Sequence, residues 1–525
     1  MKRHQYVTRL KAGLLGSALL LTAAPALAEV CGTKGGDLIF GHESKVGTLD
    51  QHVNAANATR DVSMNIFETL MTRGEDMAPV LDLADSLDVS EDGLTYTFKL
   101  RQGVTFHNGK PLTSEDVAAS FDRYNRIGTD RSALASVEKW ETPDAETFVI
   151  TLKAANPIFL ESVSASTVPI VIIPSEQKDA DATKLEPIGT GPFKLAEFVP
   201  DSHIKLVRYD DYKPNTNYEA MTGFAGYREA CVDSVTFRMM PEPAAREAAL
   251  ETGEVHIAGE VQTASVPRLE GTAGVEVVEL GSAGLMLTYP NLSQAPTDNV
   301  KVRQAILAAL NPEEILDAAN DGAFQLHGAF QFSGTTYYSE AGTELYNQNN
   351  IERAKELLKE GGYNGEKIVL LTTRDNQRFY NAALVMQSQL EAAGMTVELL
   401  LLDWPTALAK SVNETEGWNF FFTTWLTVTA QGGAQSLRNL ADPANVHKPI
   451  DNKSDEEFMK HFTLLNTSPD LEVRKQAFAD AQARVYDQVM AIPFGVIPKK
   501  QAIRDNVKGY APFFNLRAAN VWLAN

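Results

Sequence analysis

The sequence predicts an α/β protein of two lobes, each built on its own sheet and covered by helices. Two observations predict this class. The chain has 525 residues, more than the length at which a single hydrophobic core stops growing. Beyond residue 300, short apolar runs alternate with amphipathic segments of helical length. That alternation is typical of βαβ units and of a mainly parallel sheet.

The first residues have the layout of an export leader. Four basic residues precede an uncharged apolar stretch over residues 12–23, and Ala26-Leu27-Ala28 matches a cleavage pattern. An apolar stretch of about a dozen residues is too short to span a bilayer, and a buried core helix is the alternative. We expect a signal peptide over residues 1–28, cut after Ala28. Cys31 does not follow that cut directly, which argues against a lipid-modified amino terminus.

The charge of the chain excludes two kinds of partner. The formal charge is −21 for the whole sequence and −25 without the four basic residues of the leader. Such a field repels nucleic acids and anionic membranes, so we expect neither as a partner. No later segment reaches 18 apolar residues, so no further membrane span is expected.

Cys31 and Cys231 are the two cysteines of the chain. An even count in an oxidising compartment favours a disulfide, and two buried free thiols are the alternative. A bridge would close a loop of about 200 residues and stabilise the fold by at most roughly 5 kcal/mol in the chain-entropy treatment. No C-x-x-C occurs, so neither a redox site nor a zinc site is expected there.

Local patterns assign the elements of the first 290 residues. The spacing of apolar residues predicts a helix over Asp61 to Leu70, and strict alternation predicts a half-buried strand over Leu94 to Leu100. Thr113-Ser-Glu-Asp116 is a capping box that begins a helix, and the polar, glycine-containing stretch 211–229 indicates a surface loop. Further expected elements are strands at 38–40, 148–152, 193–198, 204–209, 235–239 and 285–289 and a helix at 243–252.

Helices and strands alternate in the second half. Asn311-Pro312-Glu313 supplies an N-cap, a proline and an acid to the start of one helix, and Gly394 ends another. The other expected elements are helices at 302–310, 351–359, 380–393 and 473–489 and strands at 367–371 and 397–402. Ligands of such sheets bind in crevices at strand ends, so the crevice between the lobes is the expected site.

Motifs of several enzyme classes are absent from the sequence. There is no P-loop, no G-x-S-x-G and no H-E-x-x-H. The nine histidines are scattered, with no pair two to five residues apart, so we expect neither a locally assembled metal site nor a cofactor. A carboxylate pair for glycoside hydrolysis could stand among the many acidic residues, which keeps a secreted hydrolase as a distant alternative.

Four blocks follow one another along the chain: residues 88–109 with Leu112-Thr-Ser-Glu-Asp-Val117, Pro187-Ile-Gly-Thr-Gly-Pro-Phe193, Asn299-Val-Lys-Val-Arg-Gln-Ala305, and Ala354-Lys-Glu-Leu-Leu-Lys-Glu-Gly-Gly-Tyr363. Together they resemble the family 5 extracellular solute-binding proteins, the dipeptide-, oligopeptide- and nickel-binding proteins of ABC importers. The resemblance covers essentially the whole chain after the leader. The residues of these blocks suit turns and helix caps, which do not by themselves indicate transport. The function is therefore expected from the resemblance alone.

The resemblance implies a bilobed periplasmic-binding-protein fold of type II, from the large cluster with an extra subdomain on lobe I. We expect lobe I over residues 29–284 with that subdomain near 60–190, lobe II over 285–500, and a return to lobe I over 501–525. The resemblance further implies a Cys31–Cys231 bridge like that of dipeptide-binding relatives.

The function implied is that of a periplasmic binding component, a monomer and not an enzyme. Its lobes would close on a small-molecule or peptide ligand, and the closed form would dock on the permease subunits in the inner membrane.

The candidate ligand-binding residues come from strand ends and from the resemblance. Arg374 stands where dipeptide-binding relatives hold the ligand carboxylate, which suits a bidentate guanidinium, and Trp425 is similar to an aromatic that lines their pocket. Trp404 is expected to open a loop after the strand that ends at residue 402. The full set is Arg374, Arg378, Trp404, Trp425, His42 and Glu43.

One departure from the family bears on the ligand. Peptide-binding relatives place an Asp a few residues past the pocket tryptophan, where it pairs with the α-amino group of the peptide. Here the next acid after Trp425 is Asp442, and the residues between include Thr427, Thr429 and Gln431. This loop suits a neutral polar ligand and argues against an ordinary dipeptide, so sugars, opines and metal chelates stay open beside peptide-like solutes.

Overall fold

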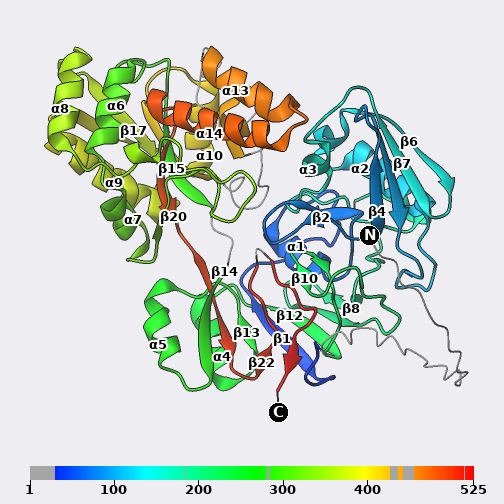
Figure 1. Ribbon diagram of the computed structural model, residues 1–525. Coiled ribbons are helices and arrows are strands. Elements are labelled where there is room, and N and C mark those ends of the chain that lie inside the picture. The colour runs from blue at the N-terminus through cyan, green and yellow to red at the C-terminus, as the bar shows by residue number, and fades with distance from the viewer. Residues whose placement is uncertain are drawn as a thin grey trace, which may run out of the picture.

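Three apolar cores, each beside its own sheet, organise the computed structural model (Figure 1). One sheet lies at the base of the molecule, an antiparallel sheet lies above it on one side, and a third sheet lies above it on the other. We name these parts lobe I, its subdomain and lobe II. The structure describes residues 30–182, 184–280, 284–425, 436–441, 455–513 and 515–524. The expected leader and its cut lie outside these residues.

The seven-stranded sheet is the centre of lobe I. In spatial order its strands are β14 (Val275–Leu280), β21 (Lys499–Arg504), β13 (Ile257–Ala258), β1 (Asp37–His42), β12 (Ser234–Met239), β9 (His203–Arg208) and β8 (Phe193–Val199). The central strand β1 runs parallel to both of its neighbours, β12 and β13. The helices of this lobe are α1 (Asn57–Ser63), α4 (Pro243–Thr252), η3 (Thr263–Ser265) and α5 (Val266–Glu270).

The subdomain is a four-stranded antiparallel sheet with one long helix. Its strands are β4 (Ala84–Val89), β5 (Thr95–Leu100), β7 (Thr147–Leu152) and β6 (Val137–Asp144). On β5 Tyr96, Phe98 and Leu100 are buried, as the alternation predicts. The Asp116 carboxylate accepts the backbone N–H of Thr113 at 2.9 Å, which confirms the capped helix start. The helices are α2 (Ser114–Ile127), η1 (Arg131–Leu134), α3 (Phe159–Val163) and η2 (Ser175–Gln177), and a small hairpin pairs β2 (Met71–Arg73) with β3 (Pro79–Leu81).

Lobe II is a six-stranded sheet between helical layers. Its strands are β16 (Gln325–Leu326), β20 (Ile492–Val496), β15 (Leu285–Pro290), β19 (Phe420–Trp425), β17 (Lys367–Thr372) and β18 (Thr396–Leu401). The expectation of a mainly parallel sheet is wrong here: β17 is parallel to β18 and β19, whereas β15, β16 and β20 pair antiparallel. The antiparallel strands β15 and β20 lead into and out of the lobe, so they run in opposite directions.

Helices cover the sheet of lobe II. They are α6 (Val300–Ala309), α7 (Pro312–Asn320), η4 (Thr343–Leu345), α8 (Ile351–Glu360), α9 (Gln377–Ala392), α10 (Trp404–Asn413), α12 (Arg438–Ala441), α13 (Glu456–Thr467) and α14 (Leu471–Gln488). Asn311 caps α7 by accepting the N–H of Glu313 at 3.1 Å. In the part of the chain that the structure describes, no helix combines the length and the apolar character needed to cross a membrane.

The described chain passes between the two lobes at Ile497-Pro498, the pair that joins β20 to β21. Figure 1 shows this crossing as a nearly straight red ribbon that leaves lobe II and enters the base of lobe I. β14 of lobe I and β15 of lobe II are also consecutive strands of the chain. This arrangement confirms the bilobed α/β class, while the residue limits expected for lobes and subdomain stay predictions.

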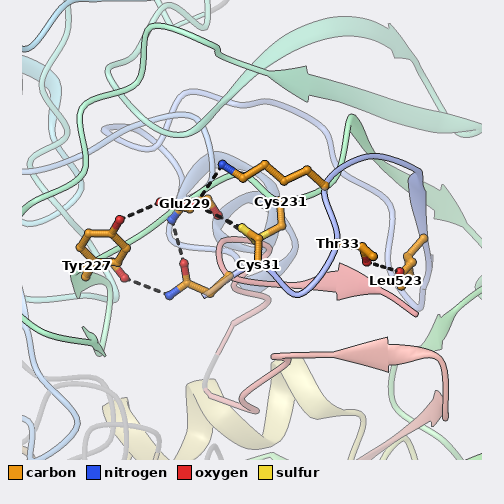
Figure 2. The surroundings of a disulfide bond; sticks show 8 residues. Cys31, Thr33, Tyr227, Glu229, Cys231 and Leu523 are labelled. Carbon is orange, nitrogen blue, oxygen red and sulfur yellow. Dashed lines mark hydrogen bonds and ion pairs between the residues drawn. A yellow bond between two sulfur atoms is a disulfide. The ribbon is translucent and has the colours of Figure 1, made fainter. Parts of the chain in front are cut away.

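The expected disulfide is confirmed, and it ties the first described residues to lobe I (Figure 2). Cys31 and Cys231 are bonded with their Cα atoms 5.5 Å apart. Two residues on, the hydroxyl of Thr33 donates to the carbonyl of Leu523 at 2.6 Å. Nearby short pairs are β10 (Met221–Thr222) with β11 (Ala225–Gly226) and β22 (Val507–Lys508) with β23 (Trp522–Leu523). Both ends of the described chain are therefore held together at the base of lobe I.

Two predictions of local structure are wrong. The expected helix over Asp61 to Leu70 is instead α1, which ends at Ser63, and the residues after it turn away from the helix axis. The apolar spacing led to this error because Ile66 and Phe67 are buried although they lie beyond the end of the helix. The stretch 211–229 is not a simple surface loop, since Arg228 in it is buried and bonds Glu68 and Asp82 at 2.6 Å each. The hydropathy of a polar stretch does not reveal whether one of its charged side chains is buried in an ion pair.

The block Pro187–Phe193 packs directly on the chain after α1. The N–H of Gly191 donates to the carbonyl of Ile66 at 2.8 Å. A Cβ added at Gly189 would lie 2.1 Å from that same carbonyl oxygen. Only glycine lets two backbones approach this closely, so the block has a structural role at the junction of lobe I and its subdomain.

We expect Gly189→Ala to lower the free energy of unfolding by about 1–3 kcal/mol or more, because the added methyl group overlaps backbone that cannot move aside. Urea unfolding followed by circular dichroism measures the change. Gly47→Ala is the matched control, since nothing lies within 4 Å of a Cβ at Gly47, and its effect should stay within about 0.5 kcal/mol. Equal effects of the two substitutions would contradict the close-packing argument.

Candidate ligand-binding cleft

A cavity of about 790 Å³ lies between the two lobes, beside the crossing at Ile497-Pro498. Lobe I contributes Glu43, Arg60, Arg246, Glu260, Lys499 and Asn515, among others. Lobe II contributes Met286, Ala318, Asp321, Asn376, Arg378 and Thr424, among others. The crossing residues Ile497 and Pro498 also line it. A volume of this size accepts a drug-sized or short peptide-like molecule.

Two buried arginines form part of the lobe I wall. Arg60 donates to the side chain of Asn515 at 3.2 Å, to the carbonyls of Ala55 and Thr167, and to the side chain of Asn57. Burial lowers the pKa of Arg60 to about 10, so the guanidinium stays charged at neutral pH. Every hydrogen-bond acceptor around it is a neutral oxygen.

Arg246 repeats this arrangement from α4. Its guanidinium donates to the carbonyls of Met240, Pro241, Gly259 and Glu260 at 2.6 to 3.1 Å. Burial lowers its pKa, and the charge of Glu43 partly offsets that effect. This side chain fixes the loop at the end of β13 and places a second buried positive charge at the cavity wall.

An acid–base pair lies beneath the lobe I wall. His42 ends β1 and is fully buried. Its Nε2 lies 3.1 Å from the Asp61 carboxylate, and its Nδ1 lies 2.7 Å from the carbonyl and 3.0 Å from the N–H of Ser44. The carboxylate facing Nε2 favours the charged imidazolium. Burial lowers the pKa of His42, but the hydrogen bond and charge of Asp61 outweigh it and raise the pKa above 6.5.

The same pair joins the cavity wall through Asp61. Burial raises the pKa of this carboxyl, but His42 and its other donors lower it more. Those donors are the Asn515 side chain at 2.7 Å and the N–H of Leu516 at 3.0 Å. His42, Glu43 and Asp61 also bring one possible metal-ligand atom each within 4.8 Å of one another. His42 and Asp61 already bond each other there, so the group is explained as an ion pair.

The lobe II wall presents the start of α9 and the end of α7. Asn376 caps α9 by accepting the N–H of Arg378 at 3.1 Å, and residues 376–379 line the cavity. Arg378 is exposed, and within the described ranges its side chain has no hydrogen bond or ion pair. Asp321 ends α7 in the left-handed conformation with φ 48° and lines the same cavity.

The six residues expected from sequence fall into three groups. Glu43 and Arg378 line the cavity, and His42 lies directly behind its wall. Arg374 lies outside the described lining and places its guanidinium 5.1 Å from the centre of the Tyr380 ring. The two tryptophans form the third group.

Trp404 opens helix α10, which corrects the expected loop. Asp403 caps the helix by accepting the N–H of Thr406 at 3.1 Å, and Pro405 stands in its first turn. The Trp404 ring stacks on Phe421 at 5.5 Å and lies outside the described cavity lining.

Trp425 is the last residue of β19 and is 1% exposed. It packs near Tyr289 and Phe330, and its Nε1 has no hydrogen-bond partner within the described ranges. Its neighbour Thr424 lines the cavity. The loop residues Thr427, Thr429 and Gln431 lie outside the described residues, so their role stays a prediction.

Sequence reasoning missed Arg60, Arg246 and Asp321. The helix predicted from Asp61 onward begins about one turn after the start of α1, so Arg60 was left out of it. Arg246 lies in a helix whose alanines and glutamates suggest a solvated surface. Their roles depend on carbonyl groups brought together from distant loops. Asp321 before Gly322 was the one local signal, since Asp and Gly favour the left-handed turn at a helix end.

Comparisons with known proteins agree with this geometry. Residues 78–445 match the family described as bacterial extracellular solute-binding proteins, family 5 middle. The chain is 28% identical over 489 residues to a probable peptide ABC transporter periplasmic-binding protein of Sinorhizobium fredii, covering 89% of this chain and 90% of the relative. It is 30% identical over 404 residues to an ABC transporter peptide-binding protein of Brucella ovis, covering 74% and 72%.

A solved structure is similar over nearly the whole chain. It is that of a periplasmic binding protein in complex with agropinic acid from A. tumefacien R10, with a TM-score of 0.70 and 26% identity over 93% of this chain and 99% of that one. A likeness over this length supports the two-lobed arrangement described above.

We expect His42→Gln to lower the free energy of unfolding by about 3–5 kcal/mol at pH 5.5, since it leaves a buried carboxylate without its partner. The loss should be smaller at pH 8.5. The folded pKa of His42 is raised, so the stabilisation by the pair is complete below the unfolded pKa near 6.5 and disappears as the pH rises through the folded pKa. Urea unfolding at both pH values measures the difference.

The control is His203→Gln. His203 makes a partly exposed pair with Glu197 at 3.2 Å, and its removal should cost less than about 1 kcal/mol at either pH. An equal loss for His42→Gln at both pH values would show that the imidazole is not charged in the fold.

Proposed function

Because the chain belongs to the bacterial extracellular solute-binding proteins of family 5, we propose that it captures a peptide or peptide-like solute outside the cytoplasm and delivers it to an ABC importer. The observation that carries this proposal is the cavity between two lobes that the described chain joins at Ile497-Pro498. The names of the Sinorhizobium and Brucella relatives support a peptide as the cargo class. The predicted leader supports export to the periplasm.

Closure of the lobes is the mechanism that this architecture suits. A ligand that contacts both walls stabilises the closed form over the open one by the contacts it makes only when both walls are near. Ile497 and Pro498 line the cavity and also form one crossing, so rotation there changes the width of the site. Binding requires no covalent step. The permease subunits would recognise the closed form of a monomer.

A second contact between the lobes lies away from the crossing at Ile497-Pro498. The hydroxyl of Tyr337 in lobe II donates to the Glu161 carboxylate of α3 at 2.7 Å, and Arg474 of α14 donates to the same hydroxyl at 3.0 Å. Tyr337 is 2% exposed. Figure 1 shows α13 and α14 reaching toward α3 of the subdomain. We interpret this contact as a latch that holds the lobes closed.

An opine-like solute is the second candidate cargo. The similar structure from A. tumefacien R10 contains agropinic acid, and no acid follows Trp425 before Asp442 in this sequence. Sugars and metal chelates stay as further alternatives. A secreted hydrolase also stays an alternative, and it differs from all of these by converting the molecule that it binds.

A thermal-shift screen over short peptides, opines, oligosaccharides and metal chelates, with mass spectrometry of whatever co-purifies, tests the proposal. A true ligand at 100 times its Kd should add about 2.7 kcal/mol of stability and emerge unaltered. We expect Ala318→Trp, which places a bulky ring in the cavity, to weaken binding at least tenfold. Leu384→Trp is the control, because Leu384 is 40% exposed on α9 and outside the described lining. If Ala318→Trp leaves the affinity unchanged, the ligand binds outside this cavity. If the ligand is chemically converted, the hydrolase alternative is favoured.

We expect Tyr337→Phe to speed ligand dissociation by about tenfold, because it removes the hydroxyl that bonds Glu161 across the lobes and Arg474 within lobe II. The ring keeps its packing near Phe478, so the fold should survive. Stopped-flow fluorescence measures the rate. Tyr338→Phe is the control, since that exposed hydroxyl bonds Glu340 within lobe II. An unchanged dissociation rate in Tyr337→Phe would exclude the latch.

A further inference from the structure

The charge of the cavity wall is opposite to that of the protein. The whole chain has a formal charge of −21. Among the described residues, the charged side chains that line the cavity are Arg60, Arg246, Arg378, Lys499, Lys500, Glu43, Glu260 and Asp321. Cations therefore outnumber anions at this wall, although acids outnumber bases in the chain by a wide margin. An anion in this cavity therefore meets more cationic than anionic side chains.

Some of these charges neutralise one another before any ligand arrives. Lys499 pairs with Glu260 at 3.0 Å, and Lys500 lies 4.0 Å from Glu279 outside the lining. After these pairs are set aside, three arginines face two acids, Glu43 and Asp321. Neither acid makes a hydrogen bond or ion pair through its side chain within the described ranges.

The two buried arginines are held by neutral groups, while carboxylates at longer range offset part of their charge: Asp61 acts on Arg60, and Glu43 with three further glutamates acts on Arg246. Arg60 and Arg246 are 5% and 2% exposed, and their hydrogen bonds go to neutral carbonyl and amide oxygens. Neutral acceptors hold a guanidinium in place without cancelling its charge. Buried charges are screened less by salt than exposed ones.

The opposite wall adds charge of the same sign. Helix α9 has 16 residues and begins at the cavity, so its first turn presents the positive end of the helix dipole. Arg378 stands in that turn with its side chain exposed. The shorter helix α7 ends at the same wall, where the negative end of its dipole and Asp321 offset part of that charge. Lobe I and lobe II thus both offer positive charge to a molecule held between them.

We propose that the cleft takes a peptide-like solute in which carboxylates outnumber amino groups, so that its net charge is negative. The inference rests on the proposed function and narrows its ligand class. Glu43 and Asp321 leave room for one cationic group on such a ligand, and the arginines of both walls match at least two anionic groups. Arg378 would meet a carboxylate directly, whereas Arg60 and Arg246 would act through their field.

Isosteric peptide pairs test this inference by titration calorimetry. The pairs are Ala-Glu and Ala-Gln, Ala-Ala-Glu and Ala-Ala-Gln, and Ala-Glu-Ala-Glu and Ala-Gln-Ala-Gln, which differ in charge but hardly in shape. We expect each Glu peptide that binds to do so at least tenfold more tightly than its Gln partner. The ratio should shrink as NaCl rises from 20 to 500 mM. Equal or tighter binding of the Gln peptides would overturn the charge inference and leave the peptide function standing.

Substitution of the free arginine gives the second readout. Arg378→Gln should bring the Glu-to-Gln ratio close to one while changing the Kd of the Gln peptides less than threefold. Arg353→Gln is the control, because Arg353 pairs with Glu356 on the exposed face of α8, and its ratio should equal that of the unmodified protein. A ratio unaffected by Arg378→Gln would overturn the assigned role of that residue. If no peptide of either charge binds, the proposed peptide function fails, and the charge inference fails with it.

Discussion

The junction between the sheets is the constraint on which the site depends. Because β21 enters lobe I two residues after β20 ends, and β14 and β15 are consecutive strands of different lobes, the described lobes share a narrow junction instead of a broad common core. Three separate apolar clusters fill lobe I, the subdomain and lobe II. Each part is therefore rigid on its own, and relative motion concentrates at the junction where the cavity lies.

The walls of the cavity are stiffened by hydrogen bonds that leave charge available. Arg60 and Arg246 bind loops through backbone carbonyls and amides, which prearranges the wall before a ligand arrives. Prearranged polar groups spare a ligand the cost of ordering them. The His42–Asp61 pair supports the same wall from behind, since Asp61 also holds Asn515 beside Arg60.

Local signals in the sequence predicted much of the fold and less of the site. The alternation of β5, the capping box of α2 and the Asn-Pro start of α7 depend on neighbouring residues, so they could be predicted. The turn after α1 could not, because it packs against Gly189 and Gly191, which are distant in sequence. Trp404 was read as a loop residue although Asp403 and Pro405 mark a helix start. The arginines of the cavity wall could not be predicted from the sequence, because the acceptors that hold them in place are brought together only in the folded chain.

The position of β1 in its sheet sets an order of assembly. This strand lies between β12 and β13, and β13 in turn needs β21, whose Ile503 pairs with Ile257. The first sheet therefore cannot be completed until nearly the whole polypeptide has been synthesised, whereas the strands of lobe II come from the continuous stretch 285–496. Pairings this distant in sequence form slowly. The base of lobe I is therefore completed only when the last long strand of its sheet, β21, is available to pair.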